Sequence, residues 1–197
     1  MAGKPDADAQ IAAYFDRSLG ALQDAAKDRA LLGVIAAMAQ AIETSLRQGG
    51  KLLIAGNGGS AADAQHLAAE FLSRYLLERR PFPAIALTTD TSVLTAVGND
   101  YGFEHAFERQ VRGLGRLGDV FLAISTSGRS RNILLALEAA HDAGLVTLGF
   151  SGAGTTEMRG LCRHFLAAPS GETAIIQQIH QVAGHAICAL VERALAE

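Results

Sequence analysis

The sequence predicts a doubly wound α/β fold built on a parallel five-stranded sheet. Five short apolar runs alternate along the chain with stretches that have apolar residues at helical spacing. The runs show no polar alternation, which is typical of strands that helices cover on both faces of a sheet. A glycine-rich turn follows the first run and leads into a helix, as at ligand-binding turns of such folds. The predicted strands are residues 51–55, 84–87, 120–124, 145–150 and 165–167.

Two helices are predicted before the first strand. Residues 6–48 have apolar side chains at helical spacing, and Gly49-Gly50 end the second helix. Because these helices precede the sheet, they have no crossover role in it. We therefore expect residues 1–50 to cover the sheet or to bury against another subunit, within a single domain of residues 1–197.

Composition limits the classes of function. The chain has 197 residues, 49% hydrophobic and 19% charged, which suits one globular domain, and its net charge of −3 offers no basic surface for nucleic acid. There is no apolar signal region at the N-terminus and no continuous apolar run long enough to span a bilayer. We therefore expect a cytoplasmic protein that binds neither nucleic acid nor membrane. Cys162 and Cys188 match no disulfide framework or metal motif and are expected to be free, largely buried thiols.

The turn after the first predicted strand has the composition of an anion site. Residues 56–60 read Gly-Asn-Gly-Gly-Ser. Glycine permits positive φ and lets a ligand approach the backbone, and Ser60 is a good N-cap for the helix that follows. The free N–H groups of a helix N-terminus would hold a phosphate. An ordinary turn is the alternative, since glycine-rich strand-to-helix turns are common in α/β proteins.

An imidazole and a carboxylate stand four residues apart on the same predicted helix. His66 and Glu70 share one helix face, where they could act on a ligand held at the turn. An ordinary exposed helix pair has the same spacing. Asp63 could simply favour the helix dipole in the first turn.

Polar residues also follow the second and third predicted strands, at the edge where doubly wound folds bind ligands. Asn99 and Asp100 come after the second strand, although with their glycine neighbours they could form only a turn. A hydroxyl-rich loop at residues 125–130 follows the third strand and opens another helix. Its hydroxyls and N–H groups could surround phosphate oxygens without a lysine, or could only cap the helix. Arg129 could add charge there or face solvent.

The last predicted helix, residues 173–196, contains further candidates. Gln177 and His180 share a face at i, i+3, whereas Gln177 and His185 are about 12 Å apart along a straight helix. One metal ion could bind Gln177 and His185 only if both side chains lean inward or different subunits contribute. Helical spacing does not choose between His180 and His185. The remaining histidines show no partner pattern and are interpreted as structural or surface residues: His105, His141 and His164.

Four motifs in order resemble the sugar-isomerase (SIS) domain family, and within it the phosphoheptose isomerases. They are GNGGSAADAQHLAAE, TTDTSVLTAVGNDYGFE, AISTSGRSRN and IQQIHQVAGH, and the resemblance extends from about residue 50 to 195. The N-terminal helices fit that family only in general character. The resemblance implies a flavodoxin-like SIS fold, a homotetramer with active sites near subunit interfaces, and one zinc ion (Zn²⁺) per subunit.

The resemblance also implies roles for individual residues. Glu70 and His185 match an acid/base pair, so the family favours His185 over His180. Residues that match the zinc ligands are His66, Glu70, Gln177 and His185. Residues that match substrate contacts are Asn57, Gly58, Gly59, Ser60, Glu70, Asn99, Asp100, Ser125, Thr126, Ser127, Ser130 and Gln177. Among these, Ser60 and the hydroxyl residues of the 125–130 loop are expected near a phosphate.

The function implied by the resemblance is aldose–ketose isomerisation. Sedoheptulose 7-phosphate would become D-glycero-D-manno-heptose 7-phosphate by proton transfer between C1 and C2, as the first step of heptose precursor synthesis. The alternative is a non-catalytic tetrameric SIS protein that binds the bacterial replication initiator, since such relatives share the glycine and serine loops. The set of Glu70, Gln177 and His185 favours the enzyme, because a binding protein needs neither a base nor metal ligands.

Overall fold

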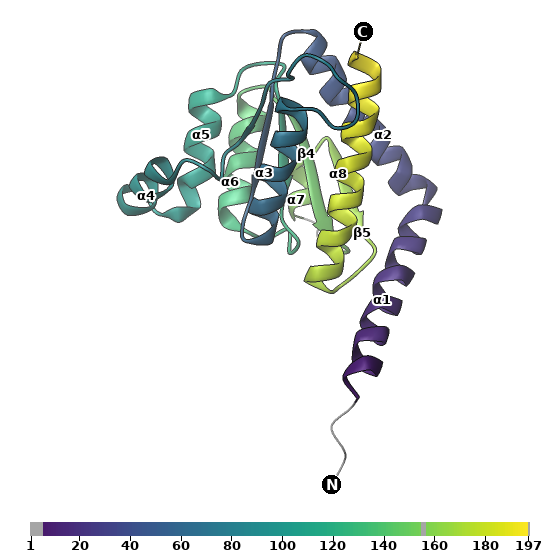
Figure 1. Cartoon of the computed structure of the whole chain (residues 1–197). Coiled ribbons are helices and arrows are strands. Elements are labelled where there is room, and N and C mark those ends of the chain that lie inside the picture. Colours follow the sequence, from purple (N-terminus) through teal and green to yellow (C-terminus); the bar gives the residue numbers. More distant parts are fainter. Residues whose placement is uncertain (1–5, 155–156, 197) are drawn as a thin grey trace.

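The computed structural model describes residues 6–154 and 157–196. Within these residues, five parallel strands form one sheet in the order β2-β1-β3-β4-β5 (Figure 1). The strands are β1 Leu52–Gly56, β2 Ala84–Ala86, β3 Val120–Ile124, β4 Val146–Gly152 and β5 His164–Ala168. The five predicted strands and the flavodoxin-like doubly wound order are confirmed.

Helices connect the strands and cover both faces of the sheet (Figure 1). The core on one face contains side chains of α2, α3 and α8, and the core on the other face contains side chains of α5, α6 and α7. The helices are α1 Ala7–Lys27, α2 Arg29–Arg47, α3 Gly59–Leu72, α4 Thr91–Asp100, the 3-10 turn η1 Phe103–His105, α5 Ala106–Leu114, α6 Arg131–Asp142, α7 Glu157–Leu161 and α8 Thr173–Leu195.

Strand side chains alternate between the two cores. Leu52, Ile54 and Leu122 point toward α2, α3 and α8, whereas Leu53 and Phe121 point toward α5 and α6. Each of these side chains is at most 2% exposed. Because both faces are buried, the strands have no polar face, which explains why the sequence shows continuous apolar runs.

The two N-terminal helices meet at Asp28, which caps both of them. Its carboxylate accepts hydrogen bonds from the backbone N–H groups of Ala30 and Leu31 at 2.8 and 3.1 Å. Beyond this break the helices differ in their surroundings. Helix α2 packs against α8, whereas α1 projects away from the body of the molecule (Figure 1).

Helix α1 exposes a stripe of large apolar side chains. Ile11, Phe15 and Leu19 recur every four residues and are 56%, 63% and 54% exposed. A stripe of this size on an extended helix is typical of a surface that another protein covers. The expectation that residues 1–50 cover the sheet or bury against another subunit stays a prediction.

Two helices, α2 and α8, are long and apolar enough to cross a membrane by length and composition alone. The sequence was expected to contain no continuous apolar run long enough to span a bilayer. Neither helix is such a run, because polar residues interrupt both of them. Both helices contribute to the core, with 39% and 50% of the tested segments buried. Core helices of globular proteins often have the same length and hydropathy, so these two properties are weak support for a membrane span.

Cys162 and Cys188 are free thiols, as expected. Burial raises the pKa of each thiol to about 12, so both stay protonated near neutral pH. Cys188 is buried in the core beside α3, whereas Cys162 is partly exposed.

His180 is a core residue of α8 and is 1% exposed. Its Nε2 lies 3.1 Å from the carbonyl oxygen of Ser151, and its ring packs against Phe150 with 5.3 Å between centroids. No described residue offers a partner to Nδ1. Burial lowers the pKa of His180 to about 4, although the Ser151 carbonyl opposes this shift.

The depressed pKa of His180 predicts that acid destabilises the fold. Between pH 6.5 and about 4 the unfolded chain binds a proton that the folded ring does not. The free energy of unfolding should therefore fall as pH drops through this window, by up to about 1.4 kcal/mol per pH unit. Replacing His180 with Gln should remove this contribution, as measured by urea unfolding at successive pH values.

The matched control is His141→Gln, at an exposed position of α6. This variant should keep the slope of the unaltered protein. An unchanged slope in the His180→Gln variant would contradict the assignment of the acid sensitivity to His180.

Candidate functional site

The carboxyl ends of β1 and β3 lie side by side at the centre of the sheet. β1 pairs with β2 on one side and with β3 on the other, so the winding direction reverses between β1 and β3. Gly56 at the end of β1 pairs with Ile124 at the end of β3. In doubly wound folds, ligands bind outside the strand ends at this reversal. The glycine turn and the loop at residues 125–130 therefore meet where a ligand is expected.

The prediction that Ser60 is the N-cap of α3 is wrong. Gly58 is the N-cap, with φ 56° and ψ −122°, and the helix begins at Gly59. A side chain at the cap would be strained by this positive φ, so the turn needs glycine more than it needs a hydroxyl. Ser60 is the second residue of the helix and is 3% exposed. Its N–H donates to the carbonyl oxygen of Asn57 at 3.0 Å.

The three glycines of the turn have different physical roles. Only Gly58 has a positive φ. A Cβ on Gly56 would collide with the backbone carbonyl of Ser60, and a Cβ on Gly59 would collide with the side-chain amide of Gln177. Gly56 therefore lets α3 pack closely against the end of β1, and Gly59 lets α8 pack directly against the turn.

A pocket of about 230 Å³ lies between the glycine turn and the loop at residues 125–130. Seven of its nine lining residues have an amide or hydroxyl side chain. The lining residues are Asn57, Gly59, Ser60, Ile124, Ser125, Thr126, Ser130, Thr173 and Gln177. Of the residues expected near a phosphate, only Ser127 does not line this pocket, and Gly58, a predicted substrate contact, does not line it either.

The loop after β3 is held by its own serines. The hydroxyls of Ser125 and Ser130 are 3.1 Å apart, and Ser125 also accepts a hydrogen bond from the N–H of Gly128 at 3.2 Å. Ser127 accepts from the N–H of Arg129 at 3.3 Å. Because Ser125 is only 4% exposed, its hydroxyl shapes the loop as well as lining the pocket.

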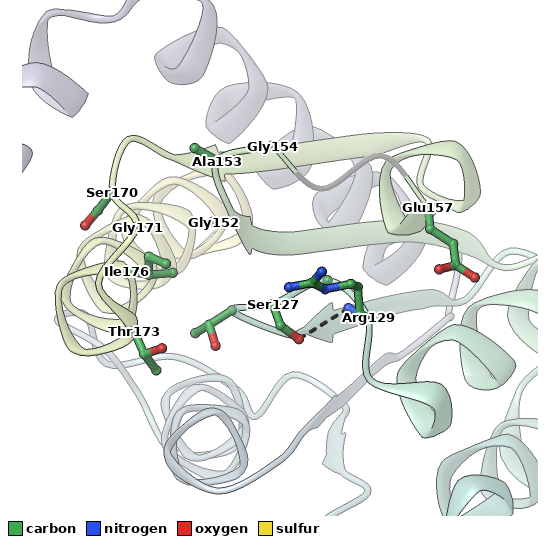
Figure 2. Close-up of a pocket in the computed structure, with 12 residues that line it drawn as sticks. Ser127, Arg129, Gly152, Ala153, Gly154, Glu157, Ser170, Gly171, Thr173 and Ile176 are labelled. Carbon is green, nitrogen blue, oxygen red and sulfur yellow. Dashed lines mark hydrogen bonds between the residues drawn. The ribbon is translucent and has the colours of Figure 1, made fainter.

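A second pocket of about 470 Å³ lies on the far side of this loop, toward the end of β4 (Figure 2). Ser127 and Arg129 form one wall, and Ser170, Thr173 and Ile176 form the opposite wall (Figure 2). Thr126 and Thr173 line both pockets. The sequence did not decide whether Arg129 faces the site or solvent. In the structure it lines this cavity beside the serine loop.

Asn132 was not expected to contribute to the site. Asn57 and Asn132 exchange two side-chain hydrogen bonds, each 2.9 Å long, and Asn132 is 5% exposed. This pair joins the glycine turn to the start of α6 and fixes the width of the pocket between them. The available signal was an amide side chain in the first turn of the predicted helix, directly after the serine loop.

His66, Glu70 and His185 converge beside α3 and α8. The Nε2 atoms of His66 and His185 are 2.7 Å apart, and Nε2 of His66 is 3.7 Å from Oε1 of Glu70. One ligand atom from each residue lies within 4.8 Å of the others. The His66 side chain is 44% exposed and that of Glu70 22% exposed, so the cluster is open to a ligand.

A glycine allows this convergence. Gly184, next to His185, faces Leu67, next to His66, and an added Cβ would lie 2.7 Å from a methyl carbon of that leucine. Helices approach one another more closely where a small residue lies at the contact. The sequence did not identify Gly184, because its partner is more than a hundred residues away.

The donor set of this cluster fits a zinc ion. Imidazole nitrogen and carboxylate oxygen are common zinc ligands, and at least one of the two facing nitrogens must offer a lone pair at 2.7 Å. His66, Glu70 and His185 would hold the ion. Gln177, the fourth predicted ligand, lines the neighbouring pocket against Gly59, and its role at the metal stays a prediction.

Asp63 is buried and lies beyond the first turn of α3, where an acidic side chain would favour the helix dipole. It is the fifth residue of α3 and is 5% exposed, so the reading that it belongs to the first turn is wrong. Gln181 donates to its Oδ1 at 3.0 Å, and no described residue pairs with Oδ2. Burial raises the pKa of Asp63, while the Gln181 bond and nearby His66 oppose the shift.

Asn99 and Asp100 end helix α4 and are exposed. The side-chain amide of Asn99 donates to Oδ1 of Asp100 at 2.7 Å. They line neither of the two pockets described above, and their contact with substrate stays a prediction. Asp90 is the N-cap of this helix and accepts a hydrogen bond from the N–H of Val93 at 3.0 Å.

Known proteins resemble the chain in sequence and in fold. Residues 13–152 match the family described as SIS domain. A phosphoheptose isomerase from Bradyrhizobium sp. (strain BTAi1) is 59% identical over 189 residues, which are 96% of each chain. The structure of a phosphoheptose isomerase from Neisseria gonorrhoeae has a TM-score of 0.90 and 41% identity, over 95% of this chain and 100% of that one. One from Francisella tularensis has a TM-score of 0.91 and 38% identity, over 95% and 99%.

These similarities include the N-terminal helices, although the sequence motifs began only near residue 50. The family match starts inside α1, and the relatives and solved structures cover nearly the whole chain. The motifs, the fold and the strand order agree with the same family. The chain therefore belongs to the SIS domain family and, within it, to the phosphoheptose isomerases.

Proposed function

We propose that this chain converts sedoheptulose 7-phosphate into D-glycero-D-manno-heptose 7-phosphate, the first step in making heptose precursors. As a phosphoheptose isomerase it is an aldose–ketose isomerase. The observation that supports this reaction most strongly is the meeting of Glu70 with His66 and His185 next to a polar pocket. A proton-transfer enzyme needs a base and an acid together, and a sugar phosphate needs an anchor for its far end.

The pocket between the glycine turn and the serine loop is the proposed phosphate site. The hydroxyls of Ser60, Thr126 and Ser130 and the start of α3 provide donors without a lysine. Gln177 lines this pocket, and His185 lies eight residues further along the same helix, about 12 Å away along its axis. A substrate that reaches both must therefore be extended, with its phosphate far from the reacting carbons.

Glu70 is the proposed base and His185 the proposed acid. Glu70 would take the proton from one carbon and return it to the neighbouring carbon, while His185 would donate to the oxygen that becomes negatively charged. Oε1 of Glu70 is 3.7 Å from Nε2 of His66, and that nitrogen is 2.7 Å from Nε2 of His185. The proposed base and the proposed acid therefore lie close together. The remaining proposed substrate contacts are Asn57, Gly58, Gly59, Asn99, Asp100, Ser125 and Ser127.

We propose one zinc ion per subunit, held by His66, Glu70, Gln177 and His185. Bound zinc would polarise the substrate carbonyl and stabilise negative charge on its oxygen. The chain's own residues would hold the sugar and move the proton. A carboxylate bound to metal is a weaker base, so Glu70 is expected to move between these two roles.

A homotetramer in the cytoplasm is the proposed form of the protein. The apolar stripe of Ile11, Phe15 and Leu19 on α1 supports burial against another subunit. The alternative function, a non-catalytic SIS protein that binds the bacterial replication initiator, is not favoured. Its glycine and serine loops would be the same, but it would have no use for the acid, base and ligand set.

Turnover of sedoheptulose 7-phosphate before and after chelation tests substrate, reaction and metal together. The purified protein should form the aldose phosphate in a coupled assay. Removal of metal should abolish turnover, because the substrate oxygen that becomes negatively charged would lose its stabilisation. One equivalent of Zn²⁺ per subunit should restore turnover. Full turnover by protein shown to be free of metal would contradict the zinc proposal and leave the substrate assignment standing.

Replacing Glu70 with Gln should lower kcat by about 10²- to 10⁴-fold, because the amide cannot take the carbon-bound proton. Binding of inorganic phosphate, measured by calorimetry, should be nearly unchanged. The control is Glu138→Gln, at an exposed position of α6, which should keep full activity. Near-normal turnover by the Glu70→Gln variant would exclude the base role.

Replacing Phe15 with Asp should dissociate the tetramer, because a carboxylate would be buried in an apolar interface. Light scattering after size exclusion should give about four times the 20.6 kDa subunit mass for the unaltered chain and a smaller mass for the variant. The control is Ala13→Asp, on the opposite side of α1. A single-subunit mass for the unaltered chain would contradict the tetramer.

A further inference from the structure

A buried ion pair links the C-terminal ends of α3 and α8, the two helices that bear the cluster of His66, Glu70 and His185. Nε of Arg79 is 3.1 Å from Oε1 of Glu192, and the two side chains are 4% and 2% exposed. Arg79 lies in the segment after α3, and Glu192 lies near the end of α8. The pair was not expected from the sequence, because 113 residues separate its members.

Arg79 holds the end of α3. Its guanidinium donates to the carbonyl oxygens of Glu70 at 2.7 Å, Phe71 at 2.8 Å and Ser73 at 3.1 Å. Carbonyls in the last turn of a helix have no partner within the helix, so this side chain supplies what the helix lacks. The first of these bonds fixes the backbone of Glu70, the proposed base.

Glu192 holds the segment that follows α3. Its carboxylate accepts hydrogen bonds from the N–H groups of Tyr75 at 2.8 Å, Leu76 at 2.6 Å and Leu77 at 2.8 Å. Burial alone would raise the pKa of Glu192, but these donors and Arg79 outweigh it, so the pKa lies below its ordinary value. The carboxylate therefore stays ionised and keeps all its partners at neutral pH.

This segment places an aromatic ring on the cluster. Tyr75 stacks on the imidazole of His185, with 5.5 Å between ring centroids and 29° between ring planes. His185 also meets the ring of His66 edge-on, with centroids 5.0 Å apart. The orientation of His185 thus depends on a ring whose own backbone N–H is held by Glu192.

Stability of the fold alone is a weak reason for such a pair. Two charges lose their hydration when buried, and apolar side chains of similar volume often stabilise a core as well or better. The bonds of Arg79 and Glu192 instead go to the backbone of Glu70 and to the segment that carries Tyr75. Groups behind the ligands commonly orient them and tune a site by about 10- to 100-fold.

We propose that Arg79 and Glu192 are positioning residues for the isomerase site, which fix the backbone of Glu70 and hold the Tyr75 ring against His185. The kinetic part of this proposal rests on the proposed function. The structural part concerns the orientation of His185 and can be measured without substrate or metal.

The test compares Glu192→Gln and Tyr75→Leu with two controls. Tyr75→Phe keeps the stacked ring, and Glu78→Gln makes the same chemical change as Glu192→Gln at an exposed position of the same segment. Glu192→Gln and Tyr75→Leu should lower kcat per folded molecule about 10- to 100-fold, with KM within about twofold. Both controls should keep the kcat of the unaltered protein.

A second measurement uses metal-free protein. A stacked ring shifts the NMR resonance of the Cε1 proton of His185 by its ring current. This resonance should move in Glu192→Gln and Tyr75→Leu and stay in place in Glu78→Gln. A purely structural pair would instead lower the melting temperature and leave both kcat per folded molecule and this resonance unchanged.

The outcomes separate the two proposals. If Glu192→Gln does not fold, the contrast between Tyr75→Leu and Tyr75→Phe decides. Unchanged kcat and an unchanged His185 resonance in Tyr75→Leu would overturn the positioning role. If the unaltered chain does not turn over sedoheptulose 7-phosphate, the proposed function fails, and the NMR comparison still tests whether Glu192 and Tyr75 orient His185.

Discussion

The parallel pairing of β1 with β3 is the constraint on which the rest of the site depends. The winding direction reverses between these strands, so the turn after β1 and the loop after β3 leave the sheet side by side. The helices that follow these strands, α3 and α6, pack on opposite faces of the sheet, and the pocket forms between the two loops. The Asn57–Asn132 pair then fixes the separation of the two loops. A polar pocket at this place is thus a consequence of topology, refined by two amides.

The chemistry at the other end of the proposed substrate depends on a second contact, between α3 and α8. These helices begin at the pocket and end at the Arg79–Glu192 pair, and the three cluster residues lie between. One pair of helices therefore sets both the distance from the proposed phosphate site to the proposed base and the mutual orientation of Glu70, His66 and His185. Fixed geometry of this kind is the main way in which enzymes lower the entropic part of a barrier.

Patterns that depend on neighbours in the sequence predicted the fold well. Continuous apolar runs identified the strands because both faces of each strand are buried, and the spacing of His66 and Glu70 placed them on one face. The failures involve distant partners. Ser60 was assigned as a cap because the packing of Gln177 and the positive φ of Gly58 are invisible in the sequence. The roles of Asp63, Asn132 and Glu192 likewise depend on groups from other elements.

Gly184 has a consequence for how freely this surface can vary. It lines neither pocket, yet an added Cβ there would lie 2.7 Å from a methyl carbon of Leu67, so the side chain next to His66 would have to shift. The outward sides of α3 and α8 can change with little effect on the geometry between them. Tolerance to substitution along these helices should therefore follow which way a position faces rather than its distance from Glu70 and His185, and it extends to a position with no side chain at all.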